Sequence, residues 1–192
     1  MAISQRQAAA LRDRFGDYPI VGLAMRYGRD CIEYAISKAM DYAGIDRVLF
    51  APLYPQYSAA TTASAKDELF SALARMRRQP AIRTLPPYYA DPLYIGALKA
   101  SIERQLRGSV AYEWAEAGLT VTMTVAPEYV ALGERDDDLV GDPYHDQCQE
   151  TAHLLGEQLS IPTDIAFQSR FGRAKWLEPA TEDELRAERE RE

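Results

Sequence analysis

The sequence contains very little cysteine and histidine. Among its 192 residues are two cysteines, Cys31 and Cys148, and two histidines, His145 and His153. Two thiols are too few for a disulfide-stabilised scaffold or for a metal site with four thiolate ligands. The histidines fall within one predicted helix, about two turns and ~12 Å apart along its axis. They therefore cannot bind one metal ion together.

Long apolar runs and common nucleotide-binding motifs are also absent. The longest apolar run, 48–54, has seven residues, whereas a membrane-spanning helix needs about 20. The N-terminal residues lack the basic-then-apolar order of a signal peptide. Neither the G-x-G-x-x-G and G-x-x-x-x-G-K motifs nor the G-x-S-x-G motif of serine hydrolases occurs. We expect a cytoplasmic protein without a transmembrane segment, and peripheral contact with a membrane is left open.

The composition is that of a globular protein with unevenly distributed charge. Hydrophobic residues make up 47% and charged residues 27% of the chain, which excludes disorder of the whole chain. Residues 1–110 carry 15 Lys/Arg and 10 Asp/Glu, and residues 111–192 carry 7 and 19. The net charge of −7 argues against nucleic-acid binding, which depends on neutralising phosphates. The basic half suits an anionic small molecule, and an ordinary acidic enzyme surface is the alternative.

Short apolar runs alternate with amphipathic stretches along the chain. Strands are predicted over 19–25, 45–53, 81–85, 119–125 and 163–167, and helices over 30–44, 62–78, 92–106 and 142–159. Residues 182–192 have almost no apolar face, so we expect a frayed, solvated tail. The alternation predicts an α/β fold, a parallel sheet with helices on both faces. In such sheets ligands bind beyond the carboxyl ends of the strands, so we expect functional residues in the loops that follow the strands.

Tyrosine and arginine gather in these loops. The first three loops contain Tyr27, Tyr54, Tyr57, Tyr88 and Tyr89. Prolines stiffen the loops, and tyrosine offers a flat apolar face with a polar tip. Arg26 and Arg170 can each pair with a carboxylate through two parallel hydrogen bonds. The combination suits a large, flat ligand that carries carboxylates.

Each of these features also has a structural alternative. Tyrosines at strand ends often cap a core, Arg26 can bond the C-terminus of a neighbouring helix, and Ser58 can cap the helix that follows it. His145, beside Asp142 and Asp146, is either a weak metal site or part of a solvated helix start. The residue types alone leave these alternatives open.

Longer sequence strings in the same loops carry more specific information than the chemistry of their individual residues. They are AMRYG (24–28), APLYPQYSAATTAS (51–64), LPPYYADPLYI (85–95), GDPYHDQCQETA (141–152) and FQSRFGRAKWLEPAT (167–181). In this order and spacing they resemble ferrochelatase, the enzyme that inserts ferrous iron into protoporphyrin IX in the last step of haem synthesis. Bacterial members are the most similar. The resemblance covers residues 4–107 and 141–185.

The resemblance implies two chelatase-like (Rossmann-like) α/β halves, truncated at both ends. Residues 1–110 would be the later part of the first domain, 111–181 the beginning of the second, and 182–192 a charged tail. Protoporphyrin IX and Fe²⁺ are the implied ligands. Because Fe²⁺ is a substrate, no permanently bound cofactor and no iron–sulfur cluster are expected. Exposed sheet edges would favour self-association.

Seven residues are assigned to porphyrin binding by the resemblance. They are Arg26, Tyr27, Tyr54, Gln56, Tyr57, Ser58 and Tyr89. Arg26 and Tyr27 would line the wall of the porphyrin cleft, and Tyr89 would contact the porphyrin. Residues 54–58 form the signature loop of the family, with a role that is partly structural.

The catalytic base of the family has no counterpart in this sequence. Bacterial members carry Ser-Phe-His-Gly-x-Pro shortly before Gly-Asp-Pro-Tyr, and this histidine handles the metal and the protons. If Pro127 matches the proline of that string, Thr124 stands at the histidine position. Threonine cannot accept a proton near neutral pH. An essential glutamate of the family would lie beyond residue 181, where this chain has EDELRAERERE.

Three hypotheses follow from the resemblance and this departure from it. The chain is a ferrochelatase, or it is a catalytically inactive porphyrin-binding protein or remnant, or it metallates another tetrapyrrole through His145 with Asp142 or Asp146.

Overall fold

The computed structural model describes residues 2–28, 30–41, 45–106, 119–123, 142–161, 163–167 and 177–189. The chain forms two compact units. Unit 1 comprises Met1–Pro52 and Ala63–Leu85, and unit 2 comprises Leu53–Thr62 and Pro86–Glu192. The predicted domain boundary at residue 110 lies outside the described residues and stays a prediction.

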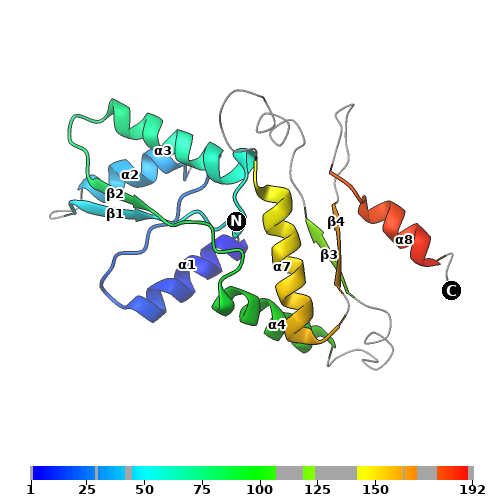
Figure 1. Ribbon diagram of the computed structural model, residues 1–192. Helices are drawn as coiled ribbons and strands as arrows, with labels where there is room; N and C mark the ends of the chain where they lie inside the picture. The colour runs from blue at the N-terminus through cyan, green and yellow to red at the C-terminus, as the bar shows by residue number, and fades with distance from the viewer. Residues whose placement is uncertain are drawn as a thin grey trace. The chain divides into compact units, whose positions relative to one another are not determined.

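Unit 1 contains a two-stranded parallel sheet. Its elements are α1 (Ala2–Phe15), α2 (Ile32–Asp41), β1 (Arg47–Phe50), α3 (Ser64–Arg75) and β2 (Ala81–Thr84) (Figure 1). Strands β1 and β2 pair in parallel, with Arg47 opposite Ala81 and Phe50 opposite Thr84. Two adjacent parallel strands require a long crossover connection, and α3 lies within it.

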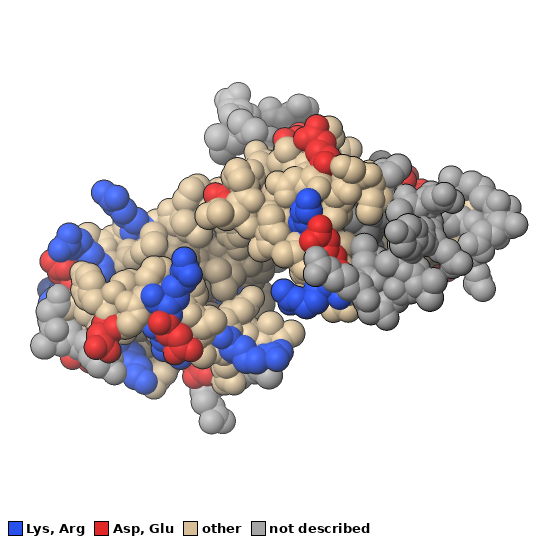
Figure 2. All heavy atoms as spheres, turned by 90° about the horizontal axis from the view of Figure 1, so that it is seen from below, with Lys and Arg blue, Asp and Glu red and all other residues tan. Residues whose placement is uncertain are grey.

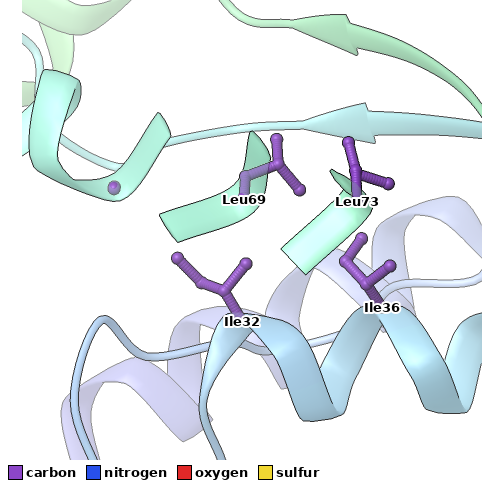
Figure 3. Packing of buried hydrophobic residues seen from close by; sticks show 5 residues of the cluster. Ile32, Ile36, Leu69 and Leu73 are labelled. Carbon is purple, nitrogen blue, oxygen red and sulfur yellow. The ribbon is translucent and has the colours of Figure 1, made fainter. Parts of the chain in front are cut away.

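The core of unit 1 forms between α2 and α3. Ile32 and Ile36 on α2 point toward Leu69 and Leu73 on α3 (Figure 3). Both pairs are spaced four residues apart, so that each pair lies on one face of its helix. Partly buried side chains from the sheet pack against this cluster: Val48, Phe50 and Ile82. The helices predicted over 30–44 and 62–78 correspond to α2 and α3.

Unit 2 contains the second parallel strand pair. Its elements are the π-helical turn η1 (Ala59–Ala63), α4 (Pro92–Leu106), β3 (Leu119–Met123), α7 (Tyr144–Leu159), β4 (Thr163–Phe167) and α8 (Thr181–Arg189). Leu119 lies opposite Thr163 and Met123 opposite Phe167. Helix α7 contacts α4 on one side and β4 on the other, as Figure 1 shows. Residues from α7 and β4 therefore share one core, which includes Tyr144, Cys148 and Phe167.

The two Asp-Pro pairs begin helices, as predicted. The Oδ1 atom of Asp91 accepts a hydrogen bond from the backbone N–H of Leu93 at 2.8 Å. The Oδ1 atom of Asp142 accepts one from the N–H of Tyr144 at 3.0 Å. Each carboxylate satisfies an N–H group that has no partner within the helix, and its charge favours the helix N-terminus.

The predicted α/β fold with parallel strands is confirmed, but the strand predicted over 19–25 is wrong. Only Met25 of this segment pairs, in an isolated bridge with Cys31. Ile20 is 62% exposed. An apolar run favours burial, but a strand also needs a neighbouring strand to accept its ladder of hydrogen bonds. Among the described residues, β1 pairs only with β2.

The frayed tail predicted over 182–192 is also wrong for its first residues, because α8 begins at Thr181. Glu182, Asp183 and Glu184 occupy its first turn, where negative charge is favourable. Arg186 pairs with Glu182 at 3.2 Å, four residues apart. These local interactions favour a helix without an apolar face.

The described surface is mixed in charge. Figure 2 shows Lys/Arg and Asp/Glu side chains interspersed on the face that it draws. None of the helices in the described part of the chain combines the length and the hydropathy that crossing a bilayer requires.

Candidate functional site

Arg26 and Tyr27 in unit 1 lie side by side. The guanidinium carbon of Arg26 is 4.7 Å from the centroid of the Tyr27 ring. This distance allows a cation–π interaction. The ring of Tyr27 is itself exposed, with 76% of the residue accessible. Together they present a cation and a flat aromatic surface to solvent.

Arg26 is held by the first turns of α3. Its Nε atom donates to Oγ of Ser64 at 3.0 Å, and Nη1 pairs with Oε2 of Glu68 at 3.3 Å. The structural alternative placed Arg26 at a helix C-terminus, and that placement is wrong because its partners lie near the N-terminus of α3. With 29% of the Arg26 side chain and 27% of the Glu68 side chain exposed, the ion pair is partly screened by water. The guanidinium carries five N–H donors, so it can hold Glu68 and also bind a ligand carboxylate.

The signature loop of unit 2 is anchored to α7. The backbone N–H of Tyr57 donates to Oε1 of Gln147 at 2.7 Å, and the N–H of Ala59 donates to Oδ2 of Asp142 at 2.7 Å. Gln56 is buried, and its Nε2 donates to Oγ1 of Thr151 at 2.9 Å. The loop is thus fixed by polar side chains that lie about 90 residues further along the chain.

The Tyr89 loop meets the same helix. Oγ1 of Thr151 lies 3.0 Å from the carbonyl oxygen of Tyr89 and donates to it. The two loops are also joined directly, because the N–H of Tyr88 donates to the carbonyl of Pro55 at 2.9 Å. Thr151 therefore connects the loop of Gln56 with the loop of Tyr89.

Ser58 and Gln56 are structural parts of this loop. Ser58 is completely buried, and its Oγ accepts a hydrogen bond from the N–H of Ala60 at 3.1 Å. The capping alternative for Ser58 is thus favoured. The tyrosines differ, because Tyr54 is exposed and the side chains of Tyr57 and Tyr89 are only half-buried. In this loop the tyrosines are more accessible to a ligand than Gln56 and Ser58.

Two further tyrosines, Tyr88 and Tyr94, contact each other in this part of unit 2. The rings of Tyr88 and Tyr94 meet edge to face, with centroids 5.4 Å apart. Burial raises the pKa of both hydroxyls, and a hydrogen bond with Gln56 partly opposes the pKa rise of Tyr94. Both hydroxyls therefore stay protonated near neutral pH.

His145, the residue considered for a metal site, contacts an aromatic ring and a carboxylate. The ring of His145 stacks on Phe167 with centroids 5.5 Å apart, and Nδ1 lies 3.7 Å from Oδ1 of Asp146. Both carboxylate oxygens of Asp142 accept backbone N–H groups. Burial raises the pKa of the nearby Cys148 thiol to about 12. In the part of the chain that the structure describes, no three His, Cys, Asp or Glu side chains gather around a common point.

Comparison with known families identifies the origin of these loops. The ferrochelatase family model matches residues 1–192. The chain belongs to the ferrochelatase family. The ferrochelatase of Rhizobium meliloti strain 1021 is 44% identical over 184 residues, which cover 93% of this chain and 51% of that protein. The ferrochelatase of Brucella canis is 39% identical over 193 residues, which cover 95% of this chain and 50% of that protein.

A third relative, the ferrochelatase of Mesorhizobium japonicum, is 42% identical over 184 residues, which cover 93% of this chain and 49% of that protein. The chain therefore spans about half the length of the ferrochelatases that it matches.

The residues that the ferrochelatase resemblance assigned to the porphyrin fall into two groups. Arg26 and Tyr27 belong to unit 1, whereas residues 54–58 and Tyr89 belong to unit 2. Thr151 brings the loops of Gln56 and Tyr89 together. The binding role of all seven stays a prediction. Thr124 and Arg170 lie outside the described residues.

Gln147 and Thr151, which hold these loops, were not predicted as site residues. Gln147 and Thr151 are spaced four residues apart and lie beside the apolar positions of Tyr144 and Cys148. A polar pair at this spacing, next to an apolar stripe, was the available signal. This polar pair indicates a second face of α7, but the sequence does not show which residues that face contacts.

Proposed function

We propose that this chain acts in the insertion of ferrous iron into protoporphyrin IX, which yields protohaem. The observation that carries the proposal is the match of the ferrochelatase family model to the whole chain. The proposed ligands are protoporphyrin IX and Fe²⁺, both as substrates. The two α/β halves divided near residue 110, the cytoplasmic location and self-association all remain predictions.

The described loops support a porphyrin as the ligand. Protoporphyrin is flat and apolar and carries two propionates. The accessible ring of Tyr27 in unit 1 and that of Tyr54 in unit 2 each suit a porphyrin face, because aromatic rings stack on flat apolar surfaces. Arg26 retains donors for a propionate beside its bonds to Ser64 and Glu68.

Iron insertion also requires the removal of two pyrrole protons. A general base commonly contributes about 10²- to 10⁴-fold to the rate of such a step. The two histidines of this sequence are His145 and His153. His145 stacks on Phe167 at the start of α7, and His153 lies 3.5 Å from Glu157 on an exposed face. The resemblance gives the base to neither histidine, and if Pro127 matches the proline of the family string, Thr124 stands at the histidine position.

This departure favours a second function, porphyrin binding without metal insertion. Such a protein would keep the aromatic loops and Arg26 and would lack the base. Both functions require porphyrin binding, and only the first one forms protohaem.

Iron insertion is tested by incubating the purified chain with protoporphyrin IX and Fe²⁺ under anaerobic, reducing conditions. A growing Soret band of haem above the protein-free rate is expected. Porphyrin binding is measured in parallel by quenching of protein fluorescence. Tyr89→Ala and Arg26→Gln should weaken it, whereas Tyr34→Ala, an exposed tyrosine on α2, should not.

The results separate the two functions. Quenching together with haem formation supports iron insertion. Quenching with haem formation equal to the blank supports a binding protein and rejects the enzyme. Absence of quenching at micromolar porphyrin rejects both.

A further inference from the structure

Helix α7 presents a polar pair to the two tyrosine loops. Gln147 accepts the backbone N–H of Tyr57 at 2.7 Å. One turn later, Thr151 accepts the amide of Gln56 at 2.9 Å and lies 3.0 Å from the carbonyl of Tyr89. We refer to the side chains of Gln147 and Thr151 as the α7 anchor.

The anchor is not required to pack α7 into its core. An apolar stripe already buries this helix: Tyr144, Cys148, Ala152 and Leu155. Thr151 is also completely buried, and a buried hydroxyl costs free energy unless it is hydrogen-bonded. A valine of the same shape would pack there as well, so packing does not explain the hydroxyl, which bonds both loops and the Gln147 carbonyl of its own helix.

The bonds of Thr151 are directional. Its Oγ1 accepts from Gln56, and its single proton is shared between the carbonyls of Tyr89 and Gln147, at 3.0 Å and 2.9 Å. A hydroxyl can donate only one hydrogen bond at a time. The bond from Gln56 uses a lone pair of Oγ1 and so limits the directions in which the proton points. The position of the Gln56 loop and that of the Tyr89 loop are therefore coupled through one atom.

We propose that Gln147 and Thr151 are positioning residues for porphyrin binding, which fix the backbone of Tyr57 and Tyr89 so that their rings meet the ligand without further ordering. This inference rests on the proposed function. Ordering a loop when a ligand binds costs affinity, and a loop that is already fixed avoids that cost. Neither anchor residue touches the ligand in this proposal.

The test compares four variants of the full chain. Gln147→Met and Thr151→Val remove the polar atoms with little change in volume. Thr151→Ser keeps the hydroxyl. Gln149→Met makes the matched change at an exposed position of α7. Protoporphyrin IX affinity is measured by fluorescence quenching, and amide hydrogen exchange is followed at Tyr57 and Tyr88 and along β4.

Gln147→Met and Thr151→Val should weaken porphyrin binding about three- to tenfold, the effect of one neutral hydrogen bond. Thr151→Ser should restore wild-type affinity, and Gln149→Met should leave it unchanged. Amide exchange should accelerate in the two loops but not along β4. A purely structural role of the anchor would accelerate exchange along β4 as well.

The outcomes are distinct. If both anchor variants bind protoporphyrin with wild-type affinity, this inference is overturned but the proposed function is not. Faster exchange along β4 to the same extent as in the loops also overturns the inference. Failure of the wild-type chain to bind protoporphyrin overturns the proposed function and this inference with it.

Discussion

Cys148 illustrates how burial alone changes the chemistry of a residue. Its thiol lies in the core of unit 2 with Tyr144 and Phe167, and no part of the residue is exposed. Burial raises its pKa from 9.0 to about 12, the negative charge of Asp142 adds to the rise, and a hydrogen bond with Tyr144 opposes it. A protonated thiol is a poor nucleophile and a poor metal ligand. Cys148 is therefore a core residue.

Stability should depend on pH through this thiol. Between about pH 9 and 12 the thiol ionises in the unfolded chain but stays protonated in the folded one, so the free energy of unfolding falls as the pH rises. One group contributes a slope of up to about 1.4 kcal/mol per pH unit. Urea unfolding across this range should show a flatter slope in Cys148→Ala. Tyr88 and Tyr94, whose pKa values are also raised, contribute to the slope that remains. Equal slopes in the variant and the wild type would contradict the assignment.

At the scale of the residue, the sequence predicts chemistry better than partners. The string P-L-Y-P-Q-Y-S identified Gln56 as important, yet its acceptor, Thr151, lies 95 residues away. Hydrogen bonds over such separations depend on the tertiary fold and leave no local pattern. Asp91, in contrast, bonds the amide two residues further on, and the helix that follows it was predicted with its observed bounds, 92–106.

Two helices of unit 2 carry an interior glycine, and the two positions differ in the space around them. A Cβ atom added at Gly156 on α7 would lie 2.5 Å from Oγ1 of Thr163 and 3.2 Å from the carbonyl of Ile161. At Gly96 on α4, nothing lies within 4 Å. Only Gly156 is therefore required for close packing, between α7 and the start of β4.

Alanine at these two glycines should have opposite effects. Gly96→Ala should stabilise the protein by up to about 1 kcal/mol, because alanine favours a helix interior. Gly156→Ala should destabilise it by about 1–3 kcal/mol, because the added methyl group has no room. Urea unfolding of both variants measures the difference. If both variants change the free energy of unfolding in the same direction, the close approach of α7 to Thr163 does not limit the size of residue 156.

The incorrect predictions for two segments of the chain have physical reasons. Residues 19–25 have a strand-like composition, but strand formation depends on a partner, which composition does not specify. Helix α8 lacks an apolar face, but charges in its first turn and the pair between Glu182 and Arg186 act locally. Strand 163–167 was predicted with its observed bounds because apolar character and β-branched residues coincide there with a neighbouring strand.

At the scale of the whole molecule, the described residues form one hydrophobic cluster in each unit. One is formed by α2, α3 and the β1–β2 sheet, and the other by α7 and β4. The clusters share no residue. Leu69 lies fully buried in unit 1, and Leu155, only 2% exposed, lies in unit 2.

Truncation of a core leucine should therefore destabilise only the unit that contains it. Leu69→Ala and Leu155→Ala should each cost about 2–5 kcal/mol, whereas Phe70→Ala, at an exposed neighbouring position, should cost much less. Hydrogen exchange should accelerate in α2 and α3 for Leu69→Ala, and in α4 and α7 for Leu155→Ala. Acceleration throughout the chain by either leucine variant would show that the two units unfold together.

The division of the chain into these units also limits how evolution can recombine it. Unit 1 is interrupted by Leu53–Thr62, which belongs to unit 2 and bonds to Asp142, Gln147 and Thr151. A crossover that replaced residues 1–85 with those of a distant homologue would import a foreign signature loop onto the native α7. Viable chimaeras should therefore inherit Leu53–Thr62 and α7 from the same parent.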